Sequence, residues 1–254
     1  MKTVKLSYPN GRPINAKRAV QTLLNRGDRL MDRGSYEQAV AAYDVVITCV
    51  DRSNTPSLRE FLAKALYNKG LALWESGRYE DEIAVYDDFI ARFGQSKDPA
   101  LRELLANTLI NKADVLWKLD RTVEELSVYE DIEVRFGRAR KPVLLEMLAT
   151  ALHNKNVALG KCGRHQEAVS ACDNFIARFG KTNTTSMRER MAKTLYDKGD
   201  SLEQLGLVSD AIAIYDDIVT RFGQSKESSI ITTVTDALER KTILLNNFDV
   251  IIAN

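Results

Sequence analysis

A nine-residue phrase, YDDFIARFG at residues 86–94, recurs along the chain with a constant spacing of 43 residues. Close copies begin at Tyr129, Cys172 and Tyr215, and a more diverged copy begins at Tyr43. A fixed period in this range is typical of repeat proteins, in which each repeat is one small structural module. The register holds without a gap. The resulting units are 15–57, 58–100, 101–143, 144–186, 187–229 and a partial sixth unit, 230–254.

Each unit has the pattern of two helices joined by a short turn. In the second unit, Leu62, Leu66 and Leu73 fall at steps of three and four residues, as on one face of a helix, and Tyr86 and Phe89 do so in the repeated phrase. Neither helix can bury its apolar face alone, so each hairpin must stack on its neighbours. The repeated phrase therefore encodes packing, and the sequence predicts an all-α solenoid of stacked hairpins.

Short signals mark the expected helix ends. Ser57 with Glu60, and Ser186 with Glu189, predict capping boxes at the starts of first helices. Gly94, at the end of the phrase, is expected to close the second helix in the left-handed conformation. The glycines expected to end first helices are Gly77, Gly163 and Gly206.

The charge balance disfavours some partners. Thirty-six basic residues against 35 acidic ones give a net charge of +1, so no overall field draws the chain to nucleic acid or to an anionic membrane. Three cysteines do not form a disulfide framework, which favours a reducing compartment. The N-terminal residues lack the apolar run of a signal peptide, and no stretch is long enough to span a membrane. We expect a cytoplasmic protein that binds neither nucleic acid nor membrane.

Few residues suggest chemistry. A metal site would group His153, Cys162, His165 and Cys172, but Cys172 and His165 stand where other units have packed tyrosines, so packing substitutions are the preferred interpretation. Nucleotide-binding and zinc-protease motifs are absent. Paired acids recur in several units, which argues against a unique catalytic pair. We predict no enzyme activity, no cofactor and no metal.

One base and one acid per unit also keep the 43-residue spacing. They suggest a ladder of ion pairs through the stack, and a structural role is preferred because half-buried charges need partners. The bases are Arg26, Lys69, Lys112, Lys155, Lys198 and Lys241, and the acids are Asp44, Asp87, Glu130, Asp173 and Asp216.

These units resemble the tetratricopeptide repeat family. The resemblance rests on small, aromatic and leucine positions that recur from the first unit to the fifth. In the second and fifth units the matching residues are Leu66, Gly70, Leu73, Gly77, Tyr79, Tyr86, Leu195, Gly199, Leu202, Gly206, Ala211 and Tyr215.

The resemblance implies a right-handed α-solenoid that serves as a protein-interaction scaffold. The usual repeat has 34 residues, so this chain is more similar to the 42–43-residue variety of kinesin light chain and bacterial tandem arrays. The base in each unit replaces a usual leucine, and the RFG ending replaces a usual proline, which affects the packing angles and the shape of the binding groove.

A ligand is expected on the face of the first helices. An asparagine recurs one step off the core stripe, and its amide can both donate to and accept from a peptide backbone. In the family that the chain resembles, asparagine at this position contacts bound peptides. The alternative is a residue that is merely solvated or that ties down a neighbouring helix. The residues are Asn25, Asn68, Asn111 and Asn154, with Asp197 at the fifth position.

Two tryptophans at equivalent positions, Trp74 and Trp117, have two interpretations. Core packing is preferred, and the alternative makes them anchors at the centre of the groove. The other residues expected on this face are Lys64, Tyr67, Asp114, His153, Lys193 and Tyr196.

The sequence thus predicts a leader at residues 1–14 and a single solenoid over 15–254. We expect a non-enzymatic scaffold that binds a peptide or partner helix on its concave face. The alternative is a structural or regulatory arm of a larger protein. That arm would associate end to end with itself through the apolar residues 244–252.

Overall fold

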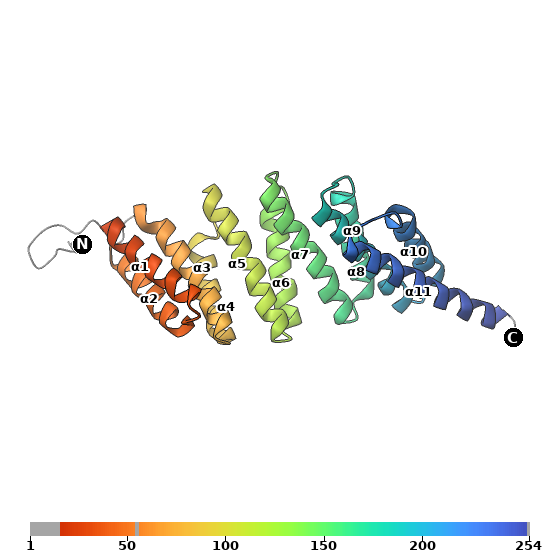
Figure 1. Ribbon diagram of the computed structural model, residues 1–254, viewed down its shortest axis with the longest axis horizontal. Coiled ribbons are helices and arrows are strands. Elements are labelled where there is room, and N and C mark those ends of the chain that lie inside the picture. The colour runs from red at the N-terminus through yellow and green to blue at the C-terminus, as the bar shows by residue number, and fades with distance from the viewer. Residues whose placement is uncertain (1–15, 54–55, 253–254) are drawn as a thin grey trace, which may run out of the picture. The chain divides into compact units, whose positions relative to one another are not determined.

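A computed structural model describes residues 16–53 and 56–252 (Figure 1). Over these residues the chain forms eleven α-helices and one short 3₁₀ helix, η1 (Pro56–Leu58), and no strand. The predicted leader lies outside the described residues. The α-helices are α1 (Ala16–Asp32), α2 (Tyr36–Ser53), α3 (Arg59–Glu75), α4 (Tyr79–Phe93), α5 (Pro99–Lys118), α6 (Thr122–Phe136), α7 (Pro142–Lys161), α8 (His165–Phe179), α9 (Thr185–Gln204), α10 (Val208–Phe222) and α11 (Ser228–Ile252).

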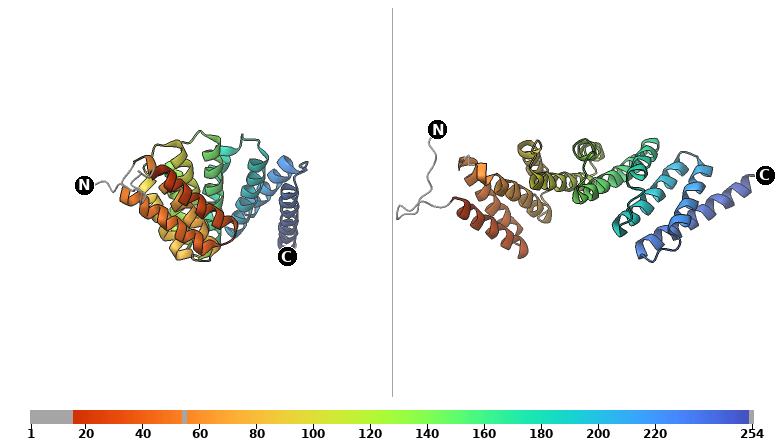
Figure 2. Two further views of the ribbon diagram at one scale, coloured as in Figure 1. Left: turned by 60° about the vertical axis from the view of Figure 1, so that its left-hand side comes forward. Right: turned by 90° about the horizontal axis from the view of Figure 1, so that it is seen from above.

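The helices form two compact parts, an N-terminal part of residues 1–124 and a C-terminal part of residues 125–254. In the N-terminal part α1 to α5 pack in chain order, and α3 also contacts α1 and α5. In the C-terminal part α7 to α11 pack in the same way, and α9 also contacts α7 and α11 (Figure 2). The prediction of an all-α fold of stacked hairpins is therefore confirmed. That residues 15–254 form one continuous solenoid stays a prediction.

The core of each hairpin is built from the repeated phrase. The Tyr86 side chain is fully buried, and its ring lies against Gly70 of the preceding helix. A Cβ atom at Gly70 would lie 2.2 Å from the Cε1 atom of Tyr86, so no larger residue fits without a shift. Gly27 with Tyr43 and Gly199 with Tyr215 repeat this contact.

The turn inside each hairpin requires a left-handed residue. Gly77 has φ +72°, Gly163 has φ +73° and Gly206 has φ +74°, as the sequence predicts, and Gly34 has φ +68°. Asp120 takes this position in the third unit with φ +57°, and aspartate tolerates that region better than most residues do.

The prediction for Gly94 is wrong. Its φ is −59°, and its amide still donates to the carbonyl oxygen of Ile90 at 2.8 Å, so the helical path continues through it. At the equivalent Gly137, Gly180 and Gly223, a Cβ atom would lie 2.4 Å, 2.6 Å and 2.6 Å from the carbonyl oxygen four residues earlier. Glycine is needed there because the last turn is tight.

The predicted capping boxes do not form. Ser57 lies inside η1, and α3 starts after Leu58 without a side-chain cap. Ser186 lies in the first turn of α9, where the Oγ1 atom of Thr184 accepts a hydrogen bond from the Met187 amide at 3.3 Å instead. The extended backbone that a cap requires belongs to Thr184, not to the serine.

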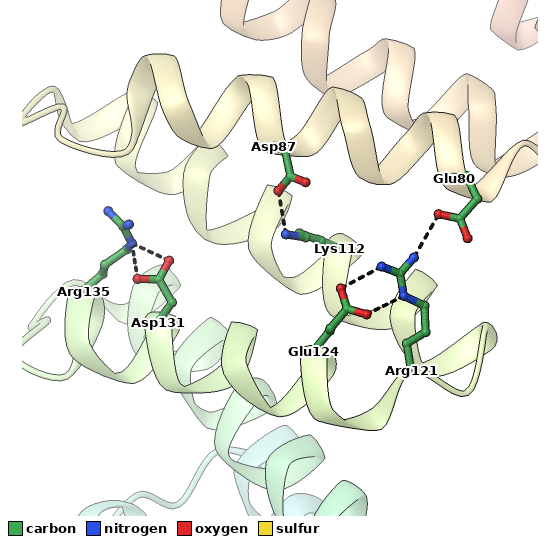
Figure 3. A network of polar contacts seen from close by, with 7 residues as sticks. All are labelled: Glu80, Asp87, Lys112, Arg121, Glu124, Asp131 and Arg135. Atoms are coloured by element: carbon green, nitrogen blue, oxygen red, sulfur yellow. Dashed lines mark hydrogen bonds and ion pairs between the residues drawn. The ribbon is translucent and has the colours of Figure 1, made fainter.

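The predicted ion-pair ladder is present and joins each second helix to the next first helix. Lys112 Nζ lies 2.6 Å from Asp87 Oδ1 (Figure 3). One partner differs from the prediction: Lys155 bonds Glu133, at 3.1 Å, in place of Glu130, because Glu133 lies one turn further along the same face of α6. The other pairs are Lys69–Asp44, Lys198–Asp173 and Lys241–Asp216.

A second set of ion pairs follows the hairpin turns. Arg121 bonds Glu80 at 2.9 Å and Glu124 at 2.7 Å (Figure 3). The Arg121 guanidinium holds the pKa of Glu124 below its usual range. Both acids are mostly exposed, so screening by solvent leaves each such pair only a small contribution to stability.

Candidate functional site

The first candidate site is a cavity of about 330 Å³ in the N-terminal part. It lies between the successive first helices α3 and α5, and one residue of α4 completes its wall. The cavity is lined by Leu71, Trp74, Glu75, Glu82, Asn111 and Asp114. It therefore brings together three of the residues that the sequence places on the ligand-binding face: Trp74, Asn111 and Asp114.

Glu82 is the unusual member of this wall. Its side chain is only 1% exposed, and its Oε2 atom has no hydrogen-bond partner among the described residues. Burial raises its pKa to about 8, with the charge of Asp114 acting in the same direction and a hydrogen bond with Tyr86 opposing it. Burial also raises the pKa of Asp114, to about 6. The cavity thus contains two carboxyl groups whose ionised forms are poorly stabilised.

The asparagines next to this cavity contact protein groups. The Asn111 Nδ2 atom lies 3.4 Å from Tyr86 Oη and 3.5 Å from Tyr67 Oη. The Asn68 Nδ2 atom donates at 3.0 Å to Asp28, which also accepts from Tyr43 at 2.9 Å. Each asparagine ties its helix to the preceding hairpin, so these contacts match the alternative in which the asparagines are structural.

The tryptophans are not buried core residues. Trp74 is half-buried, with its ring 5.4 Å from the ring of Tyr79 in an edge-to-face contact. Trp117 is 50% exposed. The preference for core packing is therefore wrong for Trp117, because the second half of α5 leaves that position open to solvent.

The second candidate site is a cavity of about 360 Å³ in the C-terminal part. It lies between the successive first helices α7, α9 and α11. Its lining includes four further residues that the sequence places on the ligand-binding face: His153, Lys193, Tyr196 and Asp197. The full set is His153, Val157, Lys193, Tyr196, Asp197, Ser229, Thr232, Thr233 and Asp236.

His153 is held in the neutral form. Burial lowers its pKa to about 4, and the nearby charges of Arg190 and Lys193 act in the same direction. Its Nδ1 atom lies 3.1 Å from the Oγ1 atom of Thr194. Burial also raises the pKa of Asp197, to about 6. At neutral pH the polar groups here suit hydrogen bonding more than proton transfer.

The remaining predicted residues line neither cavity. Asn25 is exposed and accepts a hydrogen bond from Gln21 at 2.6 Å. Lys64 forms an exposed ion pair with Glu60 at 2.7 Å. Tyr67, Asn68, Trp117 and Asn154 likewise lie outside both linings.

Sequence reasoning missed Glu82, although a signal for it exists. The same repeat position holds Ala39, Ala168 and Ala211, all fully buried, whereas the second and third units have Glu82 and Glu125. A carboxyl group at a position where three other units have a buried alanine is not explained by helix packing, and this difference is the signal that points to Glu82.

Two other cavities contain charges that are already paired. One of about 420 Å³ is lined in part by Arg92, which bonds Asp51 and Asp88, each at 2.7 Å. Another of about 250 Å³ lies beside the Lys69–Asp44 pair. Among the described residues, neither lining has an unpartnered buried polar atom of the kind found at Glu82.

The described part of the chain offers neither a metal centre nor a membrane-spanning helix. Residues 16–53 and 56–252 hold no cluster of three or more histidine, cysteine, aspartate or glutamate side chains placed to bind a metal ion. None of the described helices has the length and apolar character required to cross a membrane.

Comparison with known proteins agrees with the fold. Residues 58–97 match the model of the tetratricopeptide repeat family. No curated protein matches the sequence. The structure is similar to that of a Podosopora anserina protein assigned as a kinesin light chain with nearly identical TPR-like repeats, at 13% identity and a TM-score of 0.58, over 84% of this chain and 100% of that one.

Two further structures are similar as well. BtubC (BKLC) from P. vanneervenii is 12% identical with a TM-score of 0.58, over 93% of this chain and 83% of that one. A tetratricopeptide repeat protein from Parabacteroides merdae is 12% identical with a TM-score of 0.50, over 89% of each chain. These findings confirm the resemblance to the tetratricopeptide repeat family at residues 58–97 and a fold of the tetratricopeptide kind for the described residues.

Proposed function

We propose that the chain is a non-enzymatic scaffold that binds a protein partner along the face formed by its first helices. The tetratricopeptide fold serves protein–protein interaction in general, but a fold alone does not identify a site. The observation that supports this face is the repeated position of the two cavities. Each part of the chain has a cavity between successive first helices, lined by aromatic and polar side chains.

Such a lining suits an extended peptide or a partner helix. Aromatic residues flanked by polar groups are typical of binding hot spots, and Trp74 and Tyr196 each have this setting. Asn68 and Asn111 hold neighbouring hairpins together, so the side chains that contact the partner would be mainly those of the cavities and their exposed rims.

Site-specific photo-crosslinking tests this proposal. A benzophenone amino acid would replace Lys64 on α3 or Lys193 on α9, both exposed, and the chain would be irradiated in lysate of its own source. A matched control replaces Val134 on α6, which is 84% exposed. We expect the same partner to be crosslinked from the first-helix positions and not from Val134. Crosslinks to that partner from Val134 alone would contradict the proposal.

A second candidate function is end-to-end self-association, which α11 favours. This helix exposes Ile231 by 48%, Leu238 by 45% and Leu245 by 43%, at intervals of seven residues along one face. An apolar stripe of this kind is normally covered by another helix. In Figures 1 and 2 the C-terminal end of α11 also extends beyond α9 and α10. The side chains of residues 247–252 lie outside those described.

A further inference from the structure

We propose that the cavity between α3 and α5 binds the positively charged side chain of an arginine or lysine of the partner. This inference deepens the proposed function and rests on it, because it assigns a chemistry to one segment of the bound chain. Three features of the cavity carry it: its carboxyl groups, its aromatic wall and a described lining that includes no basic side chain.

The carboxyl groups lack a partner of opposite charge. The Oε2 atom of Glu82 is buried without a hydrogen bond, and leaving a buried polar atom unpaired is unfavourable. Asp114 is half-buried, and among the described residues no basic group contributes to the pKa shift of either acid. Glu75 adds a third carboxyl group at the rim. A basic side chain entering from outside would supply the missing counter-charge.

The aromatic wall suits the same ligand. Trp74 lines the cavity, and indole is the best of the aromatic rings for a cation–π contact. Its contact with Tyr79 orients the ring, and Leu71 offers an apolar surface to the methylene stem of an arginine or lysine. Two carboxyl groups that can ionise beside an indole ring favour a cation over a neutral or acidic side chain.

Binding of a cation should be coupled to loss of a proton. The titratable groups near Glu82 are Tyr86 on its own helix, Asp114 on α5, and Tyr67 and Glu75 on α3. Burial keeps most of the Glu82 carboxyl protonated at neutral pH, because its pKa is about 8. A bound cation stabilises the carboxylate. The affinity of the cavity for the cation should therefore rise between pH 6 and pH 8, as Glu82 releases its proton.

The cavity of the C-terminal part does not share this chemistry. Lys193 belongs to its lining, and Arg190 lies close enough to lower the pKa of His153. A cationic ligand would meet resident positive charge there. The two cavities therefore differ in the side chain that each would accept.

The test is a titration that needs no identified partner. Nα-acetyl-arginine amide is added to the full chain, and the two indole N–H resonances are followed by NMR, with the Trp117→Phe chain used to assign them. The neutral isostere Nα-acetyl-citrulline amide is the ligand control. We expect arginine amide to shift the Trp74 resonance, with affinity rising from pH 6 to pH 8, and citrulline amide to have no effect.

Variants then locate the binding. Glu82→Gln and Asp114→Asn should each lower the affinity for arginine amide by about tenfold, the usual effect of losing one charge-assisted contact. Glu60→Gln, which removes an equal charge from the exposed start of α3, should leave the affinity unchanged. If Glu82→Gln misfolds by circular dichroism, Glu82→Ala replaces it, because three other repeats hold alanine at this position.

The inference is overturned if citrulline amide binds as well as arginine amide, if both acid variants retain full affinity, or if only the Trp117 resonance moves. Such a result, together with partner crosslinks from Lys64 and Lys193, would overturn the cation pocket and leave the scaffold standing. Arginine binding without those crosslinks would leave the pocket standing and remove the proposed partner-binding face.

Discussion

At the scale of single residues, the fit of Tyr86 against Gly70 decides how two helices approach. A Cβ atom at residue 70 would lie 2.2 Å from the tyrosine ring, so we expect Gly70→Ala to destabilise the chain by about 1–3 kcal/mol through overpacking. Urea denaturation followed by circular dichroism measures this change.

Gly160→Ala is the matched control, because a Cβ atom added to Gly160, in α7, would meet no atom within 4 Å. Alanine there should be neutral or stabilising by up to about 1 kcal/mol. Equal effects at the two glycines would show that the contact with Tyr86 does not limit packing.

The fourth unit replaces both members of this contact. Asn156 stands at the glycine position and Cys172 at the tyrosine position, and both are buried. The amide group of Asn156 donates to Asp197 at 3.1 Å, while its Oδ1 atom has no partner among the described residues.

We predict strong coupling between these two residues. Cys172→Tyr alone should destabilise because Asn156 occupies the space, and Asn156→Gly alone should destabilise because it leaves a gap. The double variant restores the glycine–tyrosine pair of the first, second and fifth units, so a double-mutant cycle should give a favourable coupling of about 1–3 kcal/mol. Additive effects would contradict this prediction.

At the scale of elements, helix starts distinguish what the sequence suggests from what the structure uses. Asp98 caps α5 by accepting from the amides of Ala100 at 2.8 Å and Leu101 at 3.2 Å. We expect Asp98→Ala to cost about 1 kcal/mol of stability. Ser57→Ala, at a predicted cap that does not form, should change it by less than about 0.5 kcal/mol. Thermal unfolding of the two variants provides the comparison, and a larger loss at Ser57 would contradict it.

At the scale of the whole molecule, stability should depend on pH through Glu82. Its pKa in the folded state, about 8, lies above the ordinary 4.5. Because the pKa of Glu82 is raised in the folded state, this group's contribution to stability is full below about pH 4.5. The contribution is lost as the pH rises through about 8. Glu82→Gln should flatten that loss.

The window from pH 6.5 to 8 isolates this group. The pKa values of Asp114 and Asp197 are about 6. The lowered pKa of His153, about 4, reduces the stability of the fold only as the pH falls below 6.5. The wild-type chain should lose at most about 1.4 kcal/mol per pH unit relative to Glu82→Gln. Denaturation midpoints at several pH values measure this, and parallel curves for the two chains would contradict it.

Assembly is the other property at this scale. If the exposed stripe on α11 mediates self-association, the mass measured by light scattering should rise with concentration. Leu238→Asp should then keep the chain monomeric, whereas Val134→Asp on α6, the more exposed residue, should have no effect. A monomer at every concentration would reject the second candidate function.

Much of this architecture can be predicted from the sequence because its causes are local. The 43-residue period, the helical spacing of leucines and the left-handed glycines follow from short-range rules. The period also gives the ion-pair partners, except that Lys155 pairs with Glu133. The errors at Gly94, Ser57 and Ser186 lie at helix ends, where a shift of one or two residues changes which side chain can cap.

What the sequence alone determined is the all-helical repeat and the identity of its packing residues, because each repeat buries the same apolar positions of its two helices. Only the tertiary structure decided which side chains of successive hairpins share a cavity. Trp74, Glu82 and Asp114 come from three helices. The burial that raises the pKa of Glu82 exists only once those helices are packed, since desolvation is a property of the assembled surroundings and not of any one segment.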